Sequence, residues 1–320
     1  MNRQQRESLT GLTKNWSAPM RFDVPMALYS TLRAGGRAAG LIDVHRLYEL
    51  RQLLERLQEQ QLVFRVIGRG SNILVTDKGF PGVIIRLKGD FAGVELVKDL
   101  DSSEEISDAG EGVSLVRVGG GCSLGRFLSR CTKEGLSGLE FMAGIPGSVG
   151  GAVRMNAGAL GGEIGDCLHS VECVDACGSV IQVPKSELLL SYRKAKVAGR
   201  DIDMLIVASA CFRLMPGAQE EIRLRCTNFL VQRKGKQPTG AASAGSFFKN
   251  PAGDAAGRLI EAAGLKGSCC GEAMVSPVHA NFIVNTGKST ATDILTLMEQ
   301  VQKTVFQKFA VRLEPEVEII

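Results

Sequence analysis

Two glycine-rich segments are the places where this sequence could bind an anion. The first, Gly68-Arg69-Gly70-Ser71-Asn72, follows a β-branched run directly and leads into a second such run that begins at Ile73. Glycine allows successive backbone N–H groups to turn toward an anion, and Ser71 and Asn72 add side-chain donors. A nicotinamide-binding Rossmann loop would need a third glycine and a following helix, and this segment has neither. Taken alone, it fits either a phosphate-binding loop or an ordinary β-turn.

The second segment is denser in small residues. It reads Gly144-Ile145-Pro146-Gly147-Ser148-Val149-Gly150-Gly151-Ala152 and is followed closely by Asn156-Ala157-Gly158. Four glycines and one alanine in nine residues would let a long cofactor lie against bare backbone. A tight crossing between strands explains one or two of these glycines but not all of them. Two such loops in one chain predict a dinucleotide that contains a diphosphate, and FAD fits that description.

The elements that must position these loops are short strands mixed with helices. Leucines at helical spacing predict a helix over 45–60, and β-branched runs predict strands on both sides of the first loop. Between 90 and 214 the pattern changes to short strands and glycine turns, and Met215-Pro216-Gly217 is typical of a boundary. We therefore expect an α+β chain in three parts, residues 1–89, 90–215 and 216–320.

The third part contains the clearest helix signals. Asp254 is a candidate N-cap for a helix over 254–263, which Gly264 would end. Thr290 and Asp293 have the spacing of a capping box at the start of a longer helix.

The composition predicts a cytoplasmic protein. The 320 residues carry a net charge of +4, and the basic residues are spread along the chain, so no nucleic-acid partner is expected. The N-terminus lacks the apolar stretch of a signal peptide, and no apolar run could span a bilayer, so no membrane insertion is expected. The nine cysteines match no common metal-site spacing, and we expect reduced thiols and no metal.

Both glycine loops resemble those of a known group of flavoproteins. The segments G-R-G-S-N-I-L-V and G-I-P-G-S-V-G-G-A-V are similar to the FAD-binding domain of the vanillyl-alcohol-oxidase-type flavoproteins. Within that group the chain resembles the UDP-N-acetylenolpyruvoylglucosamine reductases, in their shorter subclass. Three further segments carry this resemblance: Ser191-Tyr192-Arg193, Gly245-Ser246-Phe247-Phe248-Lys249-Asn250-Pro251 and Leu313-Glu314-Pro315-Glu316-Val317.

The resemblance implies a fold and an activity. The fold would be a two-part FAD-binding domain of the vanillyl-alcohol-oxidase type, followed by a smaller α+β substrate-binding domain whose end returns to the active site. The activity would be reduction of UDP-N-acetylglucosamine enolpyruvate to a lactyl ether in peptidoglycan precursor synthesis. NADPH would be the hydride donor, FAD would be bound non-covalently, and the enzyme would be a monomer.

The resemblance also implies three catalytic residues. Arg193 would hold the pyruvyl carboxylate as negative charge develops, because its planar fork suits a carboxylate. Ser246 would donate the proton, and Glu316 would polarise the carboxylate or organise the proton path. Without the motifs, Arg193 would be an ordinary surface cation and Ser246 a turn residue. Spacing alone does not distinguish Glu316 from Glu314 and Glu318, which share one face if the segment is a strand.

The resemblance also offers four candidates for substrate binding. Lys236, Lys249 and Asn250 would contact the diphosphate, and Tyr192 would pack near the flavin or the substrate. The cofactor loops would contribute the residues of both glycine-rich segments: Gly68, Arg69, Gly70, Ser71, Asn72, Ile73, Gly144, Ile145, Pro146, Gly147, Ser148, Gly150, Gly151, Ala152, Asn156, Ala157 and Gly158.

Two rival interpretations remain open. Another FAD-dependent oxidoreductase of the same fold, such as an oxidase of a sugar or hydroxy acid, would share both glycine loops. It would not predict Arg193, Ser246 and Glu316 together. A nucleotide-sugar-binding protein that has lost catalysis would be favoured by the absence of any of these three residues, and all three are present.

Overall fold

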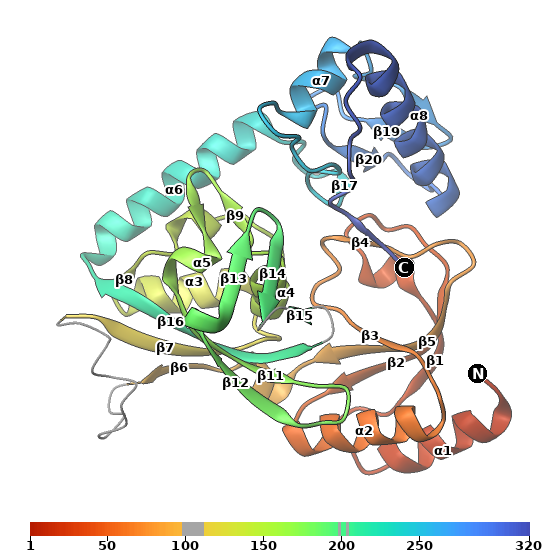
Figure 1. The fold of residues 1–320 in the computed structure, drawn as a ribbon, viewed down its shortest axis with the longest axis vertical. Coiled ribbons are helices and arrows are strands. Elements are labelled where there is room, and N and C mark those ends of the chain that lie inside the picture. Colours follow the sequence, from red (N-terminus) through yellow and green to blue (C-terminus); the bar gives the residue numbers. More distant parts are fainter. Residues whose placement is uncertain (98–111, 198–199, 203–204) are drawn as a thin grey trace.

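The computed structural model describes residues 1–97, 112–197, 200–202 and 205–320. Figure 1 shows three groups of elements, which we call the N-terminal unit (α1 to β5), the middle unit (η2 to β16) and the C-terminal unit (β17 to β21). Strands and helices are mixed in each unit, which confirms the predicted α+β class. Among the described residues, no helix has the length and apolar character needed to cross a membrane.

The N-terminal unit is a four-stranded sheet covered by two helices. Its strand order is β1-β2-β5-β3, in which only the β1–β2 pair is antiparallel. Leucines on one face of α2 pack on the sheet with Leu9 of α1, which buries the apolar stripe that the sequence predicted. The elements are α1 (Arg3–Thr13), β1 (Arg21–Pro25), η1 (Met26–Tyr29), β2 (Arg37–Val44), α2 (Leu47–Glu59), β3 (Phe64–Val66), β4 (Ile73–Leu74) and β5 (Phe80–Leu87).

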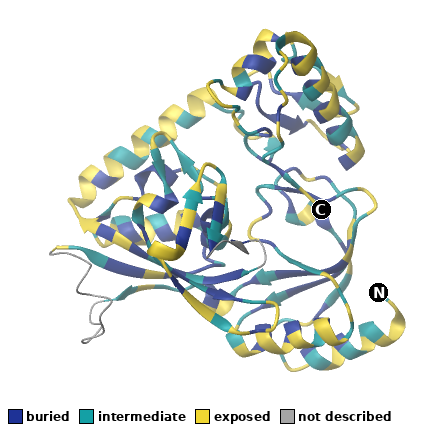
Figure 2. Cartoon of the chain, viewed as in Figure 1, coloured by how far each residue is buried: buried dark blue, intermediate teal, exposed yellow. Residues whose placement is uncertain are grey.

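The middle unit is built on an antiparallel six-stranded sheet. Its order is β12-β11-β16-β7-β6, and β8 also pairs with the long strand β16. The rings of Phe127 on α3 and Phe212 on β16 lie 4.9 Å apart in its core, between the helices and the sheet. Figure 2 shows the buried residues gathered along these strands.

Short elements surround this sheet, including the hairpin β13–β14 with β15 beside it. The elements are η2 (Gly89–Ala92), β6 (Val94–Val97), β7 (Ser114–Gly119), α3 (Leu124–Lys133), β8 (Leu136–Ser137), η3 (Glu140–Met142), α4 (Val149–Arg154), β9 (Gly158–Ala159), β10 (Gly162–Glu163), α5 (Ile164–Cys167), β11 (Leu168–Val174), β12 (Val180–Pro184), η4 (Lys185–Glu187), β13 (Leu188–Ser191), β14 (Lys194–Val197), β15 (Arg200–Asp201) and β16 (Ile206–Pro216).

The long helix α6 (Gln219–Lys236) joins the middle unit to the C-terminal unit and packs on the middle unit. The Arg225 guanidinium lies 2.8 Å from the nearly buried carboxylate of Glu140 in η3. The C-terminal unit itself has a small antiparallel sheet, in the order β17-β20-β19-β18, with α8 against it. Its elements are β17 (Ala242–Ser243), α7 (Ala256–Ala262), β18 (Cys269–Cys270), β19 (Ala273–Val275), β20 (Ile283–Asn285), α8 (Ala291–Phe309) and β21 (Glu318–Ile319).

The predicted helix caps in this unit have mixed outcomes. The capping box of Thr290 and Asp293 at the start of α8 is confirmed, and Gly264 has the left-handed φ of +79° expected after a helix. Asp254 as the N-cap of α7 is wrong, because α7 begins one residue later and its N-cap is Ala255. The Asp254 carboxylate instead pairs with Arg258.

Several contacts tie the C-terminal unit to the N-terminal unit. The Asp77 carboxylate accepts hydrogen bonds from the first N–H groups of α8, Ala291 at 2.9 Å and Thr292 at 2.8 Å. The Asn285 side chain donates to the carbonyl of Leu32 at 2.9 Å. The last strand, β21, pairs in parallel with β4, directly after the first glycine loop. The end of the chain therefore leaves the C-terminal unit and lies against the N-terminal unit (Figure 1).

We expect Asp77→Ala to lower the free energy of unfolding by about 0.5–1 kcal/mol at pH 7, because Asp77 acts as an N-cap from another unit. Burial opposes ionisation of Asp77, but bonds from Thr292 and Ala291 hold its pKa below the ordinary 3.8. The stabilisation is therefore present above pH 3.8 and is lost as the pH falls through the lower folded pKa. Chemical denaturation at several pH values measures this. Lys78→Ala is the control and should leave the free energy of unfolding unchanged. An equal loss of stability in Lys78→Ala would contradict the capping role of Asp77. So would a stability difference between Asp77→Ala and the unaltered protein that grows at acidic pH.

Candidate active site

A cavity of about 1130 Å³ is lined by residues from all three units. Both glycine loops contribute to its wall, as do Arg193, Ser246 and Glu316. These three residues come from positions far apart in the chain, so the fold alone brings them to one cavity. Its volume is slightly above the usual range of about 300–1,000 Å³ for pockets that hold one small ligand, which suits a dinucleotide together with a second molecule.

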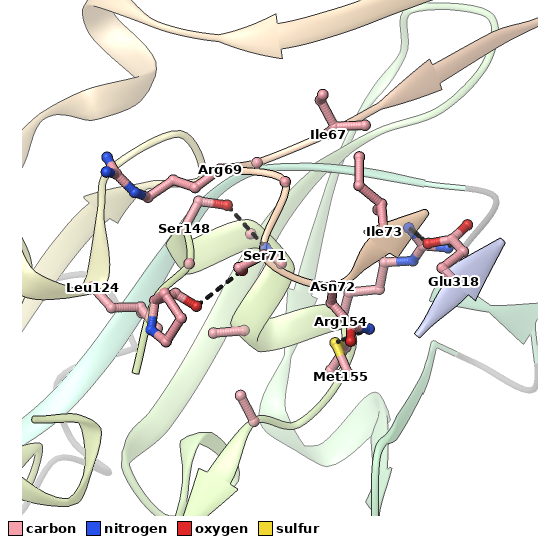
Figure 3. Close-up of a pocket in the computed structure, with 18 of the residues that line it drawn as sticks. Ile67, Arg69, Ser71, Asn72, Ile73, Leu124, Ser148, Arg154, Met155 and Glu318 are labelled. Atoms are coloured by element: carbon pink, nitrogen blue, oxygen red, sulfur yellow. Dashed lines mark hydrogen bonds and ion pairs between the residues drawn. The ribbon is translucent and has the colours of Figure 1, made fainter. Parts of the chain in front are cut away.

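The two glycine loops contact each other at one side of the cavity (Figure 3). The Ser71 hydroxyl of the first loop donates to the carbonyl of Pro146 in the second at 3.0 Å. A Cβ atom on Gly68 would lie 2.2 Å from the Ser148 hydroxyl, so a larger residue there would displace that hydroxyl. Gly70 has a φ of +68°, and a Cβ there would lie 1.8 Å from the carbonyl oxygen of Tyr29. The glycines therefore shape the loops as well as leaving backbone open to a ligand.

The cavity wall is strongly basic, which favours an anionic ligand. Arg233 lines this wall too, and its buried Nε atom has no hydrogen-bond partner among the described residues. Apolar side chains such as Ile67, Ile145 and Leu205 line the same cavity and could cover aromatic rings. Nine cationic side chains line it against two carboxylates: Arg65, Arg69, Lys88, Arg126, Arg154, Arg193, Lys194, Arg233 and Lys249 against Glu316 and Glu318.

Arg193 and Glu316 form an ion pair within this wall. The Arg193 Nε atom lies 2.6 Å from Glu316 Oε1, and their side chains are only 19% and 10% exposed. Burial raises the pKa of the Glu316 carboxyl above its ordinary 4.5, while Arg193 and Lys249 oppose that shift. A buried carboxyl with a raised pKa beside a fixed cation is typical of an acid–base or charge-stabilising site.

The hairpin between β13 and β14 positions Arg193. Arg193 has a left-handed φ of +56°, an unusual conformation for a residue other than glycine and one found often at active sites. Asn156 supports this turn, because its fully buried side chain donates to the carbonyl of Ser191 at 3.3 Å and accepts from the N–H of Gly165 at 3.0 Å. The Arg193 guanidinium also donates to the carbonyl of Gly158 at 3.2 Å.

Asn72 and Phe247 hold the backbone of Glu316. The Asn72 amide at the end of the first glycine loop donates to the carbonyl of Glu316 at 2.9 Å. The Glu316 N–H donates to the carbonyl of Phe247 at 2.8 Å. Glu314, Glu316 and Glu318 do not share one strand face, since the strand covers only 318–319. Glu314 lies near Lys249 with a side chain that is 75% exposed, whereas Glu316 faces the cavity.

Ser246 is fixed by the two phenylalanines that follow it. Phe247 and Phe248 are completely buried in the core of the C-terminal unit. The buried Asn281 side chain accepts from the N–H of Phe248 at 2.9 Å and donates to its carbonyl at 2.8 Å. Gly245, with a φ of +78°, turns the chain before Ser246. This anchoring places Ser246 at the cavity wall.

The predicted cofactor residues line this cavity with two exceptions. Asn156 is buried behind the wall, and Gly144 faces α6, where a Cβ would lie 3.0 Å from Leu230. The others line it: Gly68, Arg69, Gly70, Ser71, Asn72, Ile73, Ile145, Pro146, Gly147, Ser148, Gly150, Gly151, Ala152, Ala157 and Gly158.

The four predicted substrate residues are placed differently from one another. Lys249 lines the cavity, while Lys236 lies at the exposed end of α6. The Tyr192 ring lies against the Arg193 guanidinium, 4.9 Å from its centre, and the Tyr192 hydroxyl accepts from the N–H of Asn250 at 3.3 Å. The Asn250 side chain accepts from the N–H of Ala256 at the start of α7.

Several residues at the site were not found from the sequence. Asn281 supports Ser246, but nothing in its local sequence distinguishes it from a surface asparagine. Arg65 lies three residues before the first glycine loop, and Arg154 lies two residues after the second. Their closeness to the loops in the sequence could have indicated that they belong to the site. Glu318 gave no signal apart from its place in the charged tail, yet its side chain is only 27% exposed.

We expect the Glu316 carboxyl to titrate above its ordinary 4.5 and to titrate still higher in Arg193→Met, which removes an opposing cation. Carbon-detected NMR of carboxyl-labelled glutamate would follow the titration, with Glu316→Gln identifying the signal. A midpoint that falls or stays constant in Arg193→Met would show that this cation does not act on Glu316.

Comparisons with known proteins agree with this geometry. Residues 38–184 match the model of an FAD binding domain, and residues 237–320 match that of the UDP-N-acetylenolpyruvoylglucosamine reductase C-terminal domain. The chain is 41% identical to UDP-N-acetylenolpyruvoylglucosamine reductase 2 of Symbiobacterium thermophilum, over 92% of this chain and 90% of that protein. It is 40% identical to the corresponding reductase of Desulfosudis oleivorans, over 97% of each chain.

A solved structure supports the same relationship. The crystal structure of UDP-N-acetylenolpyruvylglucosamine reductase from Thermus caldophilus matches with a TM-score of 0.75 and 38% identity, over 94% of this chain and 98% of that one. The predicted order, an FAD-binding domain followed by a smaller α+β domain, is confirmed. The chain belongs to the UDP-N-acetylenolpyruvoylglucosamine reductase family.

Proposed function

We propose that this chain reduces UDP-N-acetylglucosamine enolpyruvate to UDP-N-acetylmuramate with NADPH as the hydride donor, a step of peptidoglycan precursor synthesis. The observation that carries the proposal is the convergence of the Arg193–Glu316 pair and Ser246 on one basic cavity. Membership of the reductase family supports the same reaction.

The cavity has the features that FAD requires. Bare backbone at Gly147, Gly150 and Gly151 can accommodate a diphosphate, and the neighbouring cations Arg69 and Arg126 can neutralise it. Ile67, Ile145 and Leu205 offer apolar surface for the rings. The chemistry supplied by bound FAD is transfer of a hydride from NADPH to the terminal vinyl carbon of the substrate.

Arg193 is proposed to bind the carboxylate of the enolpyruvyl group. Negative charge develops on this carboxylate and the adjacent carbon during hydride addition, and a preorganised cation stabilises it. The Nε atom of Arg193 donates to Glu316 at 2.6 Å, and one terminal nitrogen donates to the carbonyl of Gly158. The guanidinium has five N–H donors, so the others can bind a ligand. The contacts with Glu316 and Gly158 fix the guanidinium before substrate arrives.

Ser246 is proposed to give a proton to the carbon that bears the ether oxygen. A serine hydroxyl is a weak acid, so it needs cations or a proton relay close by. Glu316, whose pKa is raised by burial, is the candidate partner for the carboxylate or for that relay. Lys249, close to Ser246 in the chain and in the same wall, is proposed to contact the substrate diphosphate. Lys236 and Asn250 are proposed as further contacts of the diphosphate, and Tyr192 as a contact of the flavin or the substrate.

Every residue of the candidate site belongs to one chain, so a monomer is sufficient, and the dissolved nucleotide substrates favour action in the cytoplasm. We propose a division into 1–89 and 90–215 for the two parts of the FAD-binding domain. Residues 216–320 would form the substrate-binding domain, with α6 as its connection to the middle unit.

Stopped-flow absorbance tests the reaction. The FAD-loaded protein is reduced with NADPH without oxygen and then mixed with UDP-N-acetylglucosamine enolpyruvate. We expect flavin reoxidation with formation of the lactyl product, and Ser246→Ala to slow this second step about 10²- to 10⁴-fold, the usual contribution of proton transfer.

Two controls make the result specific. Reduction by NADPH should be unchanged in Ser246→Ala, and Ser243→Ala, in the nearby strand β17, should react like the unaltered protein. Reduced flavin that ignores the enolpyruvyl substrate but reoxidises with oxygen would favour an oxidase and overturn the proposal.

A further inference from the structure

A carboxylate outside the proposed catalytic set joins three segments at the edge of the cavity. Glu318 Oε1 lies 2.9 Å from a terminal nitrogen of Arg65, and the two terminal nitrogens of Arg154 lie 3.2 Å from the two oxygens of Glu318. Arg65 lies on β3 before the first glycine loop, and Arg154 ends α4 after the second. Figure 3 shows Arg154 beside Glu318. One side chain therefore connects the end of the chain to the elements that flank both loops.

The backbone pairing at this point is short. β21 has two residues, and its contact with β4 includes bonds from the N–H of Glu318 to the carbonyl of Asn72 and from the N–H of Ile320 to the carbonyl of Leu74, at 3.0 and 2.9 Å. A parallel pair of this length is weak on its own. A partly buried carboxylate held by two guanidinium groups, one of them bidentate, provides the stronger and more directional contact.

The same pairing controls the backbone of Glu316. The Asn72 side chain holds the carbonyl of Glu316, while the Asn72 carbonyl accepts from the N–H of Glu318. One loop residue therefore holds two positions of the tail on either side of Val317. Movement of Glu318 away from β4 would draw the Glu316 backbone with it. The Glu316 carboxylate, 2.6 Å from Arg193, would then lose its position.

We propose that Glu318 is a positioning residue. By pairing with Arg65 and Arg154 it holds the C-terminal strand on the first glycine loop and so fixes Glu316 beside Arg193. Without the Glu318 charge, the two guanidinium groups would repel each other, and the strand would be held only by its few backbone bonds, the Asn72 side chain and the packing of Val317 and Ile320. The kinetic consequence rests on the proposed function, whereas the structural consequence does not.

The test uses the FAD-loaded full chain with Glu318→Gln, which keeps the shape and removes the charge, and Glu318→Asp, which keeps the charge. Hydrogen exchange should accelerate in Glu318→Gln at the amides of Glu318 and Ile320. The substrate-dependent reoxidation step should slow by about tenfold to a hundredfold, as for other small displacements of a catalytic group, while NADPH reduction stays unchanged. Glu318→Asp should recover most of the lost rate.

A matched control is Glu7→Gln, which removes the same charge from an exposed pair with Arg3 and should change none of these quantities. Unchanged amide exchange in Glu318→Gln, or equal slowing of both half-reactions, would overturn the positioning role. Equal rates of substrate-dependent reoxidation in Glu318→Gln and Glu318→Asp would overturn it as well. If the unaltered protein does not turn over the substrate, the proposed function fails instead, and the exchange result still decides the role of Glu318.

Discussion

The ion pair between Arg193 and Glu316 is the constraint on which the rest of the arrangement depends. Its two partners are 123 positions apart and come from different units, Arg193 from a hairpin of the middle unit and Glu316 from the tail of the chain. The pair forms only while the C-terminal unit is docked, through Asp77 at α8 and through β21 on β4. The contacts between units are therefore requirements of the site as well as of stability.

Burial and charge act against each other at this pair. Burial favours the neutral form of Glu316, and the adjacent cations favour the ionised form, with burial the stronger effect on its pKa. A carboxyl in this state can exchange a proton more readily than an exposed glutamate at neutral pH. The excess of cations around the cavity also attracts anionic cofactor and substrate, so the same charges serve binding and catalysis.

The sequence predicted the parts whose signals are local. The amphipathic helices, the capping box at α8 and the two glycine loops follow from spacing and residue type. The family motifs led to Arg193, Ser246 and Glu316. The residues that hold the catalytic candidates in place could not be predicted from spacing. Asn156, for example, was predicted to contact the cofactor, whereas in the structure its side chain donates to the carbonyl of Ser191. Such contacts join segments distant in the chain, and only the folded structure brings them together.

The central claim is that cofactor, substrate and the three catalytic candidates meet in one cavity. A crystal structure of the FAD-loaded chain with UDP-N-acetylglucosamine enolpyruvate tests this most directly. We predict FAD against both glycine loops, the enolpyruvyl carboxylate about 3 Å from the guanidinium nitrogens of Arg193, and Ser246 facing the enolpyruvyl carbons. A carboxylate bound away from Arg193, or FAD held outside the two loops, would contradict the account.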